Sequence, residues 1–155
     1  MEIKDDAPAT ARGAVDVAAP PEVVWATLTD IDQWARWNPD VKSSSLDGPL
    51  APGTEFRWKA GPGTISSRIQ EVDPPRRIAW TGKTFGIEAV HVHRLEPRNG
   101  NTRVHSEESW DGLIVRLLTG SMRKTLQKST ESGLQYLKAE AERRVAAKAA
   151  GSEQG

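Results

Sequence analysis

Four side chains that can carry chemistry lie on two stretches separated by Asn99-Gly100. They are His91 and His93 before the pair, and Ser106 and Glu108 after it. Asn-Gly is typical of a two-residue hairpin turn, because both residues tolerate positive φ there. Such a turn fixes the register, so counting back from it pairs His93 with Ser106 and His91 with Glu108. We therefore predict that His91 and Glu108 are cross-strand neighbours on one face of a sheet, with Cβ atoms about 4.5–5.5 Å apart.

A histidine beside a carboxylate can serve three purposes. The carboxylate raises the histidine pKa and orients its ring, which suits proton transfer between a bound molecule and the protein. The same pair can recognise a polar group of a ligand without catalysis, or it can only stabilise a core. His91, His93 and Glu108 also have the composition of a two-histidine, one-carboxylate metal site. No further ligand is evident in the sequence, so we predict no metal.

The elements that position these residues alternate with a period of two. The first strand is predicted over residues 10–18. Two short helices follow it: one begins at Pro20-Pro21 and Glu22, and the second covers Ile31–Trp37 with Asp30 as its cap. Six further strands, joined by turns rich in Gly and Pro, are predicted over residues 41–46, 54–60, 64–73, 76–82, 87–96 and 102–110. Strands grouped in this way predict an antiparallel sheet in an α+β fold.

From residue 112 to about residue 146 the period changes to that of one long amphipathic helix, and Gly120 is expected to kink its start. Thr125, Ser129 and Gly133 are spaced i, i+4, i+8, and we place them on the side that faces the sheet. Small residues there leave space under the helix. Space lined by tryptophans such as Trp58, Trp80 and Trp110 predicts a small-molecule pocket.

Composition excludes several classes of protein. The 155 residues include 21 Lys or Arg and 21 Asp or Glu, so the zero net charge does not suit a nucleic-acid binder. The chain has no cysteine, and it contains no apolar run of the length that spans a membrane. No signal peptide or cofactor motif appears, so we expect a cytoplasmic protein without a cofactor. We expect a flexible leader over 1–9, one domain over 10–146 and a disordered tail over 147–155.

Several segments resemble the START-like (SRPBCC) superfamily, and within it the polyketide cyclase/dehydrase group. The resemblance covers roughly residues 11–145. It implies a helix-grip fold, in which a curved seven-stranded antiparallel sheet grips a long C-terminal helix and two short helices follow the first strand. The segments that carry it are Val17–Trp25, Leu28–Asp30, Trp34–Pro39, Glu71–Trp80, His91–Pro97, Gly100–Arg103 and Glu108–Gly112.

The resemblance and the residues together lead to a functional hypothesis. We expect a monomer or weak dimer that binds a small hydrophobic ligand, aromatic or polyketide-like, between the sheet and the helix, in a biosynthetic, carrier or resistance role. One alternative is a polyketide cyclase in which His91 and Glu108 are the catalytic acid and base. A second alternative is a partner-binding domain similar to a co-chaperone. The candidate ligand-binding residues are Trp37, Phe56, Trp58, Ile69, Trp80, His91, His93, Ser106, Glu108, Trp110, Met122, Thr125, Ser129, Gly133 and Tyr136.

Overall fold

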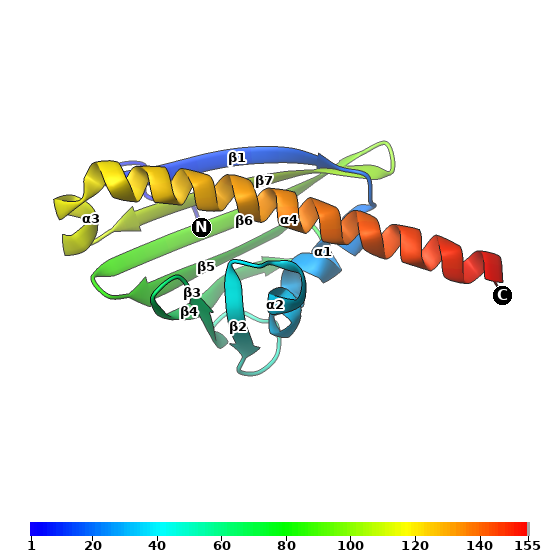
Figure 1. The fold of residues 1–155 in the computed structure, drawn as a ribbon, viewed down its shortest axis with the longest axis horizontal. Coiled ribbons are helices and arrows are strands. Elements are labelled where there is room, and N and C mark those ends of the chain that lie inside the picture. The colour runs from blue at the N-terminus through cyan, green and yellow to red at the C-terminus, as the bar shows by residue number, and fades with distance from the viewer. Residues whose placement is uncertain (155) are drawn as a thin grey trace.

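The structure, a computed structural model, describes residues 1–154 and contains one seven-stranded antiparallel sheet. The strand order β1-β7-β6-β5-β4-β3-β2 brings the first and last strands together, and the rest follow as a meander (Figure 1). The predicted α+β helix-grip fold is confirmed. The strands are β1 (Ala9–Val17), β2 (Val41–Leu46), β3 (Glu55–Ala60), β4 (Gly63–Asp73), β5 (Arg77–Thr84), β6 (Ile87–Arg98) and β7 (Asn101–Asp111).

The sheet is curved, and its register shifts in two places. One shift lies in β2 between Val41 and Ser43, and the other lies in β4 between Ile69 and Glu71. An extra residue in one strand of a pair bends that strand and increases its twist. The sheet therefore has a concave face, which carries the helices, and a convex face on the other side.

The helices after β1 are α1 (Pro21–Thr29), a 3-10 turn η1 (Ile31–Gln33) and α2 (Trp34–Trp37). The predicted start at Pro21 is confirmed. The second helix differs from the prediction, because it is divided into η1 and α2. Asp30 is the N-cap residue of η1 as predicted, but its side chain makes no capping hydrogen bond. Its carboxylate instead lies 4.0 Å from Arg144 in the C-terminal helix.

The C-terminal region consists of α3 (Leu113–Leu117) and α4 (Thr119–Gln154). The break lies at Leu118, where φ is −120° and ψ is 38°, rather than at the predicted Gly120. Helix α4 lies along β1 and extends beyond the sheet (Figure 1). It continues through Gln154, into the stretch predicted as a disordered tail. Gly155, the last residue of that stretch, lies outside the described residues.

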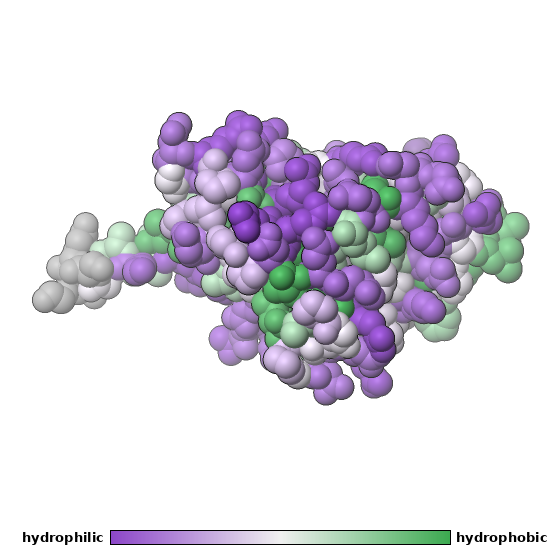
Figure 2. Space-filling model, turned by 180° about the vertical axis from the view of Figure 1, so that it is seen from behind, coloured by the Kyte–Doolittle hydropathy of each residue, from purple (hydrophilic) through white to green (hydrophobic). Residues whose placement is uncertain are grey.

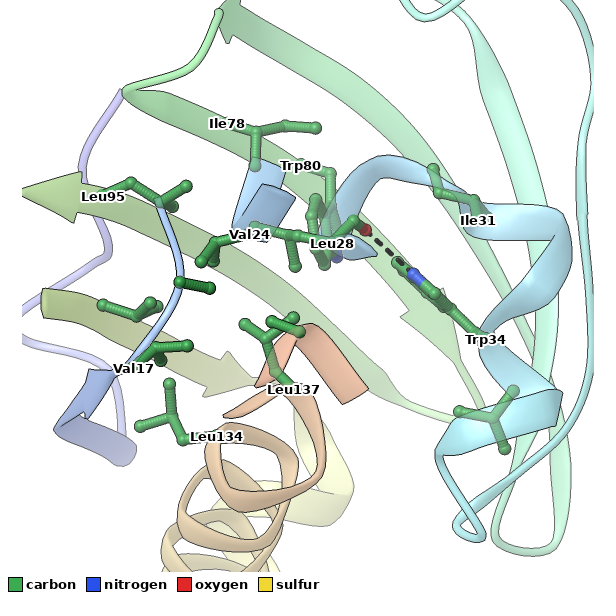
Figure 3. Close-up of a cluster of buried hydrophobic side chains, with 14 of the residues drawn as sticks. Val17, Val24, Leu28, Ile31, Trp34, Ile78, Trp80, Leu95, Leu134 and Leu137 are labelled. Atoms are coloured by element: carbon green, nitrogen blue, oxygen red, sulfur yellow. Dashed lines mark hydrogen bonds between the residues drawn. The ribbon is translucent and has the colours of Figure 1, made fainter. Parts of the chain in front are cut away.

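The main core lies between the concave face and the helices. Val24 and Leu28 from α1, and Leu134 and Leu137 from α4, point toward sheet residues that include Ile78 (Figure 3). Burying each of these aliphatic side chains contributes about 1.5–3 kcal/mol relative to leaving it exposed. This core fixes the position of α1 and of the C-terminal half of α4 on the sheet.

The N-terminal residues cover part of the convex face. Ile3 is buried there in a small cluster with Ala79, Val90 and Val92. The amide of Lys4 donates to Ser109 Oγ at 3.1 Å. The first nine residues therefore differ from the predicted flexible leader, because they make specific contacts with the sheet. The side opposite to the view of Figure 1 is largely hydrophilic, with separate hydrophobic areas (Figure 2).

Candidate functional site

A chain of polar side chains crosses the middle of the concave face on β6 and β7. The predicted register is confirmed, with His91 opposite Glu108 and His93 opposite Ser106. Glu108 Oε1 lies 3.0 Å from His91 Nδ1, but the alignment is not that of a hydrogen bond. On the other side, His91 Nε2 lies 3.0 Å from Ser106 Oγ, which in turn lies 3.3 Å from His93 Nε2. The register positions all four side chains because the turn at Asn99-Gly100 has positive φ at both residues.

The Ser106 hydroxyl couples the two imidazole rings. It has one hydrogen, so it can donate to only one ring, and the other ring must donate to it. Burial and the neighbouring His91 hold the pKa of His93 well below its usual range, so His93 stays neutral. When His91 carries a proton on Nε2 it donates to Ser106, which then donates to His93. The orientation of the Ser106 hydroxyl therefore depends on which tautomer each ring adopts.

Aromatic rings pack against this chain. Trp80 lies 4.9 Å from the His91 ring and 5.2 Å from the His93 ring, between centroids. Trp34 contacts Phe56, Trp58 and Trp80 at 5.6–5.7 Å, and its Nε1 donates to Leu28 O. Trp34 is therefore a buried centre of the aromatic cluster.

The face of α4 that packs on the sheet differs from the predicted face. Thr125 and Ser129 are exposed, and Gly133 is half-buried, with open space where a Cβ would be. The buried stripe instead consists of Leu126, Thr130, Leu134, Leu137 and Ala141. The stripe is displaced because α4 packs on β1, at one edge of the sheet, rather than over its centre. This leaves part of the concave face without a helix packed on it.

The predicted ligand-binding residues fall into three groups by exposure. Fully or largely buried are Phe56, Ile69, Trp80, His93, Ser106 and Glu108. Half-buried are Trp37, Trp58, His91, Trp110, Met122, Gly133 and Tyr136, and exposed are Thr125 and Ser129. The His91 and Glu108 side chains are 16% and 11% exposed, so a bound molecule could reach this pair. Phe56 and Ile69 are 0% exposed and serve as core residues.

Two surface hollows lie away from this cluster. One, of about 360 Å³, lies where the end of β1, the β6–β7 hairpin and α4 meet, and Lys138 lines it. The other, of about 330 Å³, lies beside β5 and β6 and is lined by arginines and acids. Neither contains a predicted ligand-binding residue. Within residues 1–154, no group of three or more side chains is arranged to hold a metal ion, and no helix there is both long and apolar enough to span a membrane.

Sequence reasoning missed Thr130. It is buried on α4, and its Cγ2 lies 3.6 Å from the position that a Cβ on Gly13 would occupy. Gly13 is opposite Ser106 in the sheet, so Thr130 lies over the row that contains Ser106 and His93. Its Oγ1 and His93 Nδ1 are both buried without a hydrogen-bond partner. The signal for Thr130 was its spacing of four from Leu126 and from Leu134.

The fold has parallels among solved structures. A hypothetical protein from Helicobacter pylori matches with a TM-score of 0.79 and 17% identity, covering 91% of this chain and 96% of its own. The Zhui aromatase/cyclase from Streptomyces sp. R1128 matches with a TM-score of 0.75 and 19% identity, covering 88% and 94%. A START superfamily protein from Mycobacterium smegmatis matches with a TM-score of 0.70 and 15% identity, covering 86% and 97%.

At these identities the structural matches establish the fold. Comparison with curated proteins identifies no match. The family described as polyketide cyclase / dehydrase and lipid transport matches residues 8–142, which is most of the sequence. The chain therefore belongs to this family.

Proposed function

We propose that the protein binds a small hydrophobic ligand, aromatic or polyketide-like, on the open part of the concave face beside α4. One observation carries the proposal. His91 and Glu108 form a close, partly exposed polar pair at the end of a polar chain against which aromatic rings pack. A few polar groups among apolar walls are the usual composition of a small-molecule site. The biological setting would be biosynthesis, transport or sequestration of such a ligand.

Each part of the face has a distinct task in this proposal. The indole rings of Trp58 and Trp110 are half-buried, so they offer flat apolar surface on which a ligand ring can stack. His91 and Glu108 would bind a hydroxyl or carbonyl group of the ligand. The absence of a side chain at Gly133 leaves space beside α4. Membership of the family supports a ligand of this class.

Titration with 1,8-dihydroxyanthraquinone, followed by quenching of tryptophan fluorescence, tests the proposal. We expect saturable binding by the unchanged protein. His91→Phe keeps a ring of similar size but removes the polar atoms, so it should weaken binding about tenfold, the equivalent of one hydrogen bond. His105→Phe is the matched control, because His105 lies on the opposite face of the sheet and contacts Glu96.

Equal affinity in the unchanged protein and in both variants would show that the ligand does not bind at His91. Absence of saturable quenching by the anthraquinone and by simpler naphthols would contradict the proposal itself. Circular dichroism of each variant separates loss of binding from loss of fold.

A second candidate is catalysis of an aldol cyclisation and dehydration, which the hydrogen-bonding chain through His91 favours. His91 would remove a proton from a carbon between two carbonyl groups, and the resulting enolate carbon would attack a ketone. That attack would close the ring, and protonated His91 would return its proton to the new alkoxide. Loss of this hydroxyl group and of a hydrogen from the adjacent carbon, as water, would then leave a carbon–carbon double bond in the ring. The carboxylate of Glu108 would stabilise the protonated His91. The neighbouring Streptomyces structure is that of an aromatase/cyclase.

Deuterium exchange at the central methylene of 1-phenyl-1,3-butanedione, followed by proton NMR, tests this step without the natural substrate. We expect acceleration by the unchanged protein and a loss of about a hundredfold in Glu108→Gln. If Glu108→Gln binds the anthraquinone normally and neither protein accelerates exchange, the protein binds ligands without catalysing this reaction.

A further inference from the structure

Large hydrophobic side chains protrude at the end of the sheet where β6 begins. Phe85 is 75% exposed, Leu113 is 69%, Leu117 is 72% and Leu118 is 53%. With the exception of the N-terminal Met1, these four are the large hydrophobic residues that the structure leaves exposed. We call them the apolar tip. Their exposure needs an explanation, because contiguous apolar surface is a common mark of an interaction site.

The four side chains come from segments that contact one another. Phe85 lies in the turn between β5 and β6, and its ring would contact a Cβ on Gly63 at the β3–β4 turn. In the same turn, Gly86 lies against Ile114 of α3. Leu113 and Leu117 are four residues apart in α3 and share its outer face. Val115, on the inner face, is fully buried, so α3 is apolar on both sides.

The helical segment that carries the tip is strongly basic. Residues 112–130 contain Arg116, Arg123, Lys124 and Lys128 and no acidic residue, although the whole chain has zero net charge. Arg116 pairs with Asp111, and Arg123 donates to Pro8 O. Lys124 and Lys128 are exposed, and they make no ion pair with another described residue. Lys124 and Lys128 therefore place two exposed cations on the helix that follows the protruding leucines.

We propose that the apolar tip docks the protein on the surface of an anionic lipid membrane. The leucines and Phe85 would enter the boundary between headgroups and acyl chains, and Lys124 and Lys128 would contact the anionic headgroups. Peripheral binding of this kind scales with the apolar area inserted and with the attraction of nearby cations to anionic lipid.

The chemistry favours lipid over a second copy of the chain. Two tips brought together would place their basic segments side by side, and like charges oppose such contact. The tip consists of three leucines and one phenylalanine, and it carries none of the chain's tryptophans or its tyrosine, which are typical anchors of a protein–protein interface. Anionic lipid satisfies both the charge and the apolar surface. This docking is independent of the proposed ligand site.

Flotation with two sets of vesicles tests the proposal. One set is phosphatidylcholine alone, and the other contains about a third phosphatidylglycerol, which supplies the negative surface charge. We expect binding to the anionic vesicles that falls steeply as salt is raised, because salt screens the attraction. The double variant Leu113→Ser, Leu117→Ser should reduce binding about tenfold or more, since two inserted side chains are lost.

A matched pair of charge reversals separates local from overall charge. Lys124→Glu should weaken vesicle binding severalfold, whereas Arg98→Glu should change it little, because Arg98 is exposed at the opposite end of β6. Equal effects of the two reversals would overturn docking by the tip, as would equal binding to both vesicle sets. Self-association that the leucine variant abolishes, without vesicle binding, would assign the tip to a second copy instead. Binding of the leucine variant to the dihydroxyanthraquinone reports separately on the ligand site.

Discussion

The two ends of the concave face are built on different principles. At the end covered by α1, aliphatic side chains such as Val17, Val104 and Leu137 interlock and are almost fully buried. Around His91 and Glu108 the face is polar, and buried nitrogen atoms remain without full hydrogen bonding. The first region maximises apolar burial. The second retains polar groups whose burial is unfavourable for folding.

This contrast separates stability from function along the same strands. Strand β6 contributes Leu95 to the closed end and His91 to the open end, four residues apart on one face. Unsatisfied buried polar atoms each cost roughly 1–3 kcal/mol. The closed end offsets this cost, so substitutions at the two ends should affect different properties.

The largest expected effect is in the buried aromatic cluster between the two ends, where Phe56→Ala removes a fully buried ring that contacts Trp34 and Trp80. A cavity of this kind lowers the free energy of unfolding by about 3–5 kcal/mol. Phe85→Ala is a matched control, because Phe85 is the only other phenylalanine and is exposed. This substitution should lower the free energy of unfolding by less than about 0.5 kcal/mol. Urea unfolding measures both. Similar losses of free energy of unfolding in the two variants would contradict a core role for Phe56.

The second prediction concerns the polar chain and pH. The pKa of His93 is held far below its usual range, so the unfolded chain binds a proton below about pH 6.5 that the folded chain does not. The free energy of unfolding is therefore highest above about pH 6.5. It decreases as the pH falls below that value, by up to about 1.4 kcal/mol per pH unit. His93→Gln should flatten this slope, whereas His105→Gln should preserve it. Identical slopes would mean that His93 titrates normally.

Alanine substitutions at two glycines should each change the free energy of unfolding by about 1 kcal/mol, in opposite directions. Alanine at Gly133 would meet open space, so the gain in helix propensity should stabilise the protein by about 1 kcal/mol. Alanine at Gly13 would place a Cβ 3.0 Å from Leu134 Cδ1, which is packed and cannot easily move. This overpacking should destabilise by about 1 kcal/mol or more. Thermal unfolding measures whether each variant is more or less stable than the unchanged protein. If both were more stable, Gly13 and Gly133 would have equal room for a Cβ.

Local rules predicted the parts of the fold that depend on neighbouring residues. The turn at Asn99-Gly100 is short enough to fix the register, which is why the His91–Glu108 contact was predictable. The packed face of α4 was not, because Thr125–Ser129–Gly133 and Leu126–Thr130–Leu134 are stripes one residue apart. The choice between them depends on which strand the helix covers, and this is decided by tertiary packing.

Contacts between distant segments explain the other differences. Ile3 stands alone among charged and small residues, so no periodicity indicated that it would pack on the convex face. Trp34 lies in a short helix between Gln33 and Ala35, and its burial depends on three aromatic residues from β3 and β5.

The smallest expected effect comes from removing an ion-pair cluster that connects α4 to the closed end. Glu140 accepts from Arg143 and Arg144, which lower its pKa to about 2, and Arg144 reaches Asp30 beside α1. Because the folded pKa is depressed, this contribution is present above about pH 4.5 and disappears as the pH falls toward about 2. Glu140→Gln should cost only about 0.5–1 kcal/mol at pH 7, since Arg143 is largely exposed and solvent screens its charge.

The pH windows of Glu140 and His93 do not coincide, so one set of unfolding curves can assign each loss to its own end of the face. Loss of stability below pH 6.5 that His93→Gln removes belongs to the open end. Loss below pH 4.5 that Glu140→Gln removes belongs to the closed end. If either substitution changed the slope in the other window, the two ends would be coupled through α4, and substitutions in the core would then alter the ligand site as well.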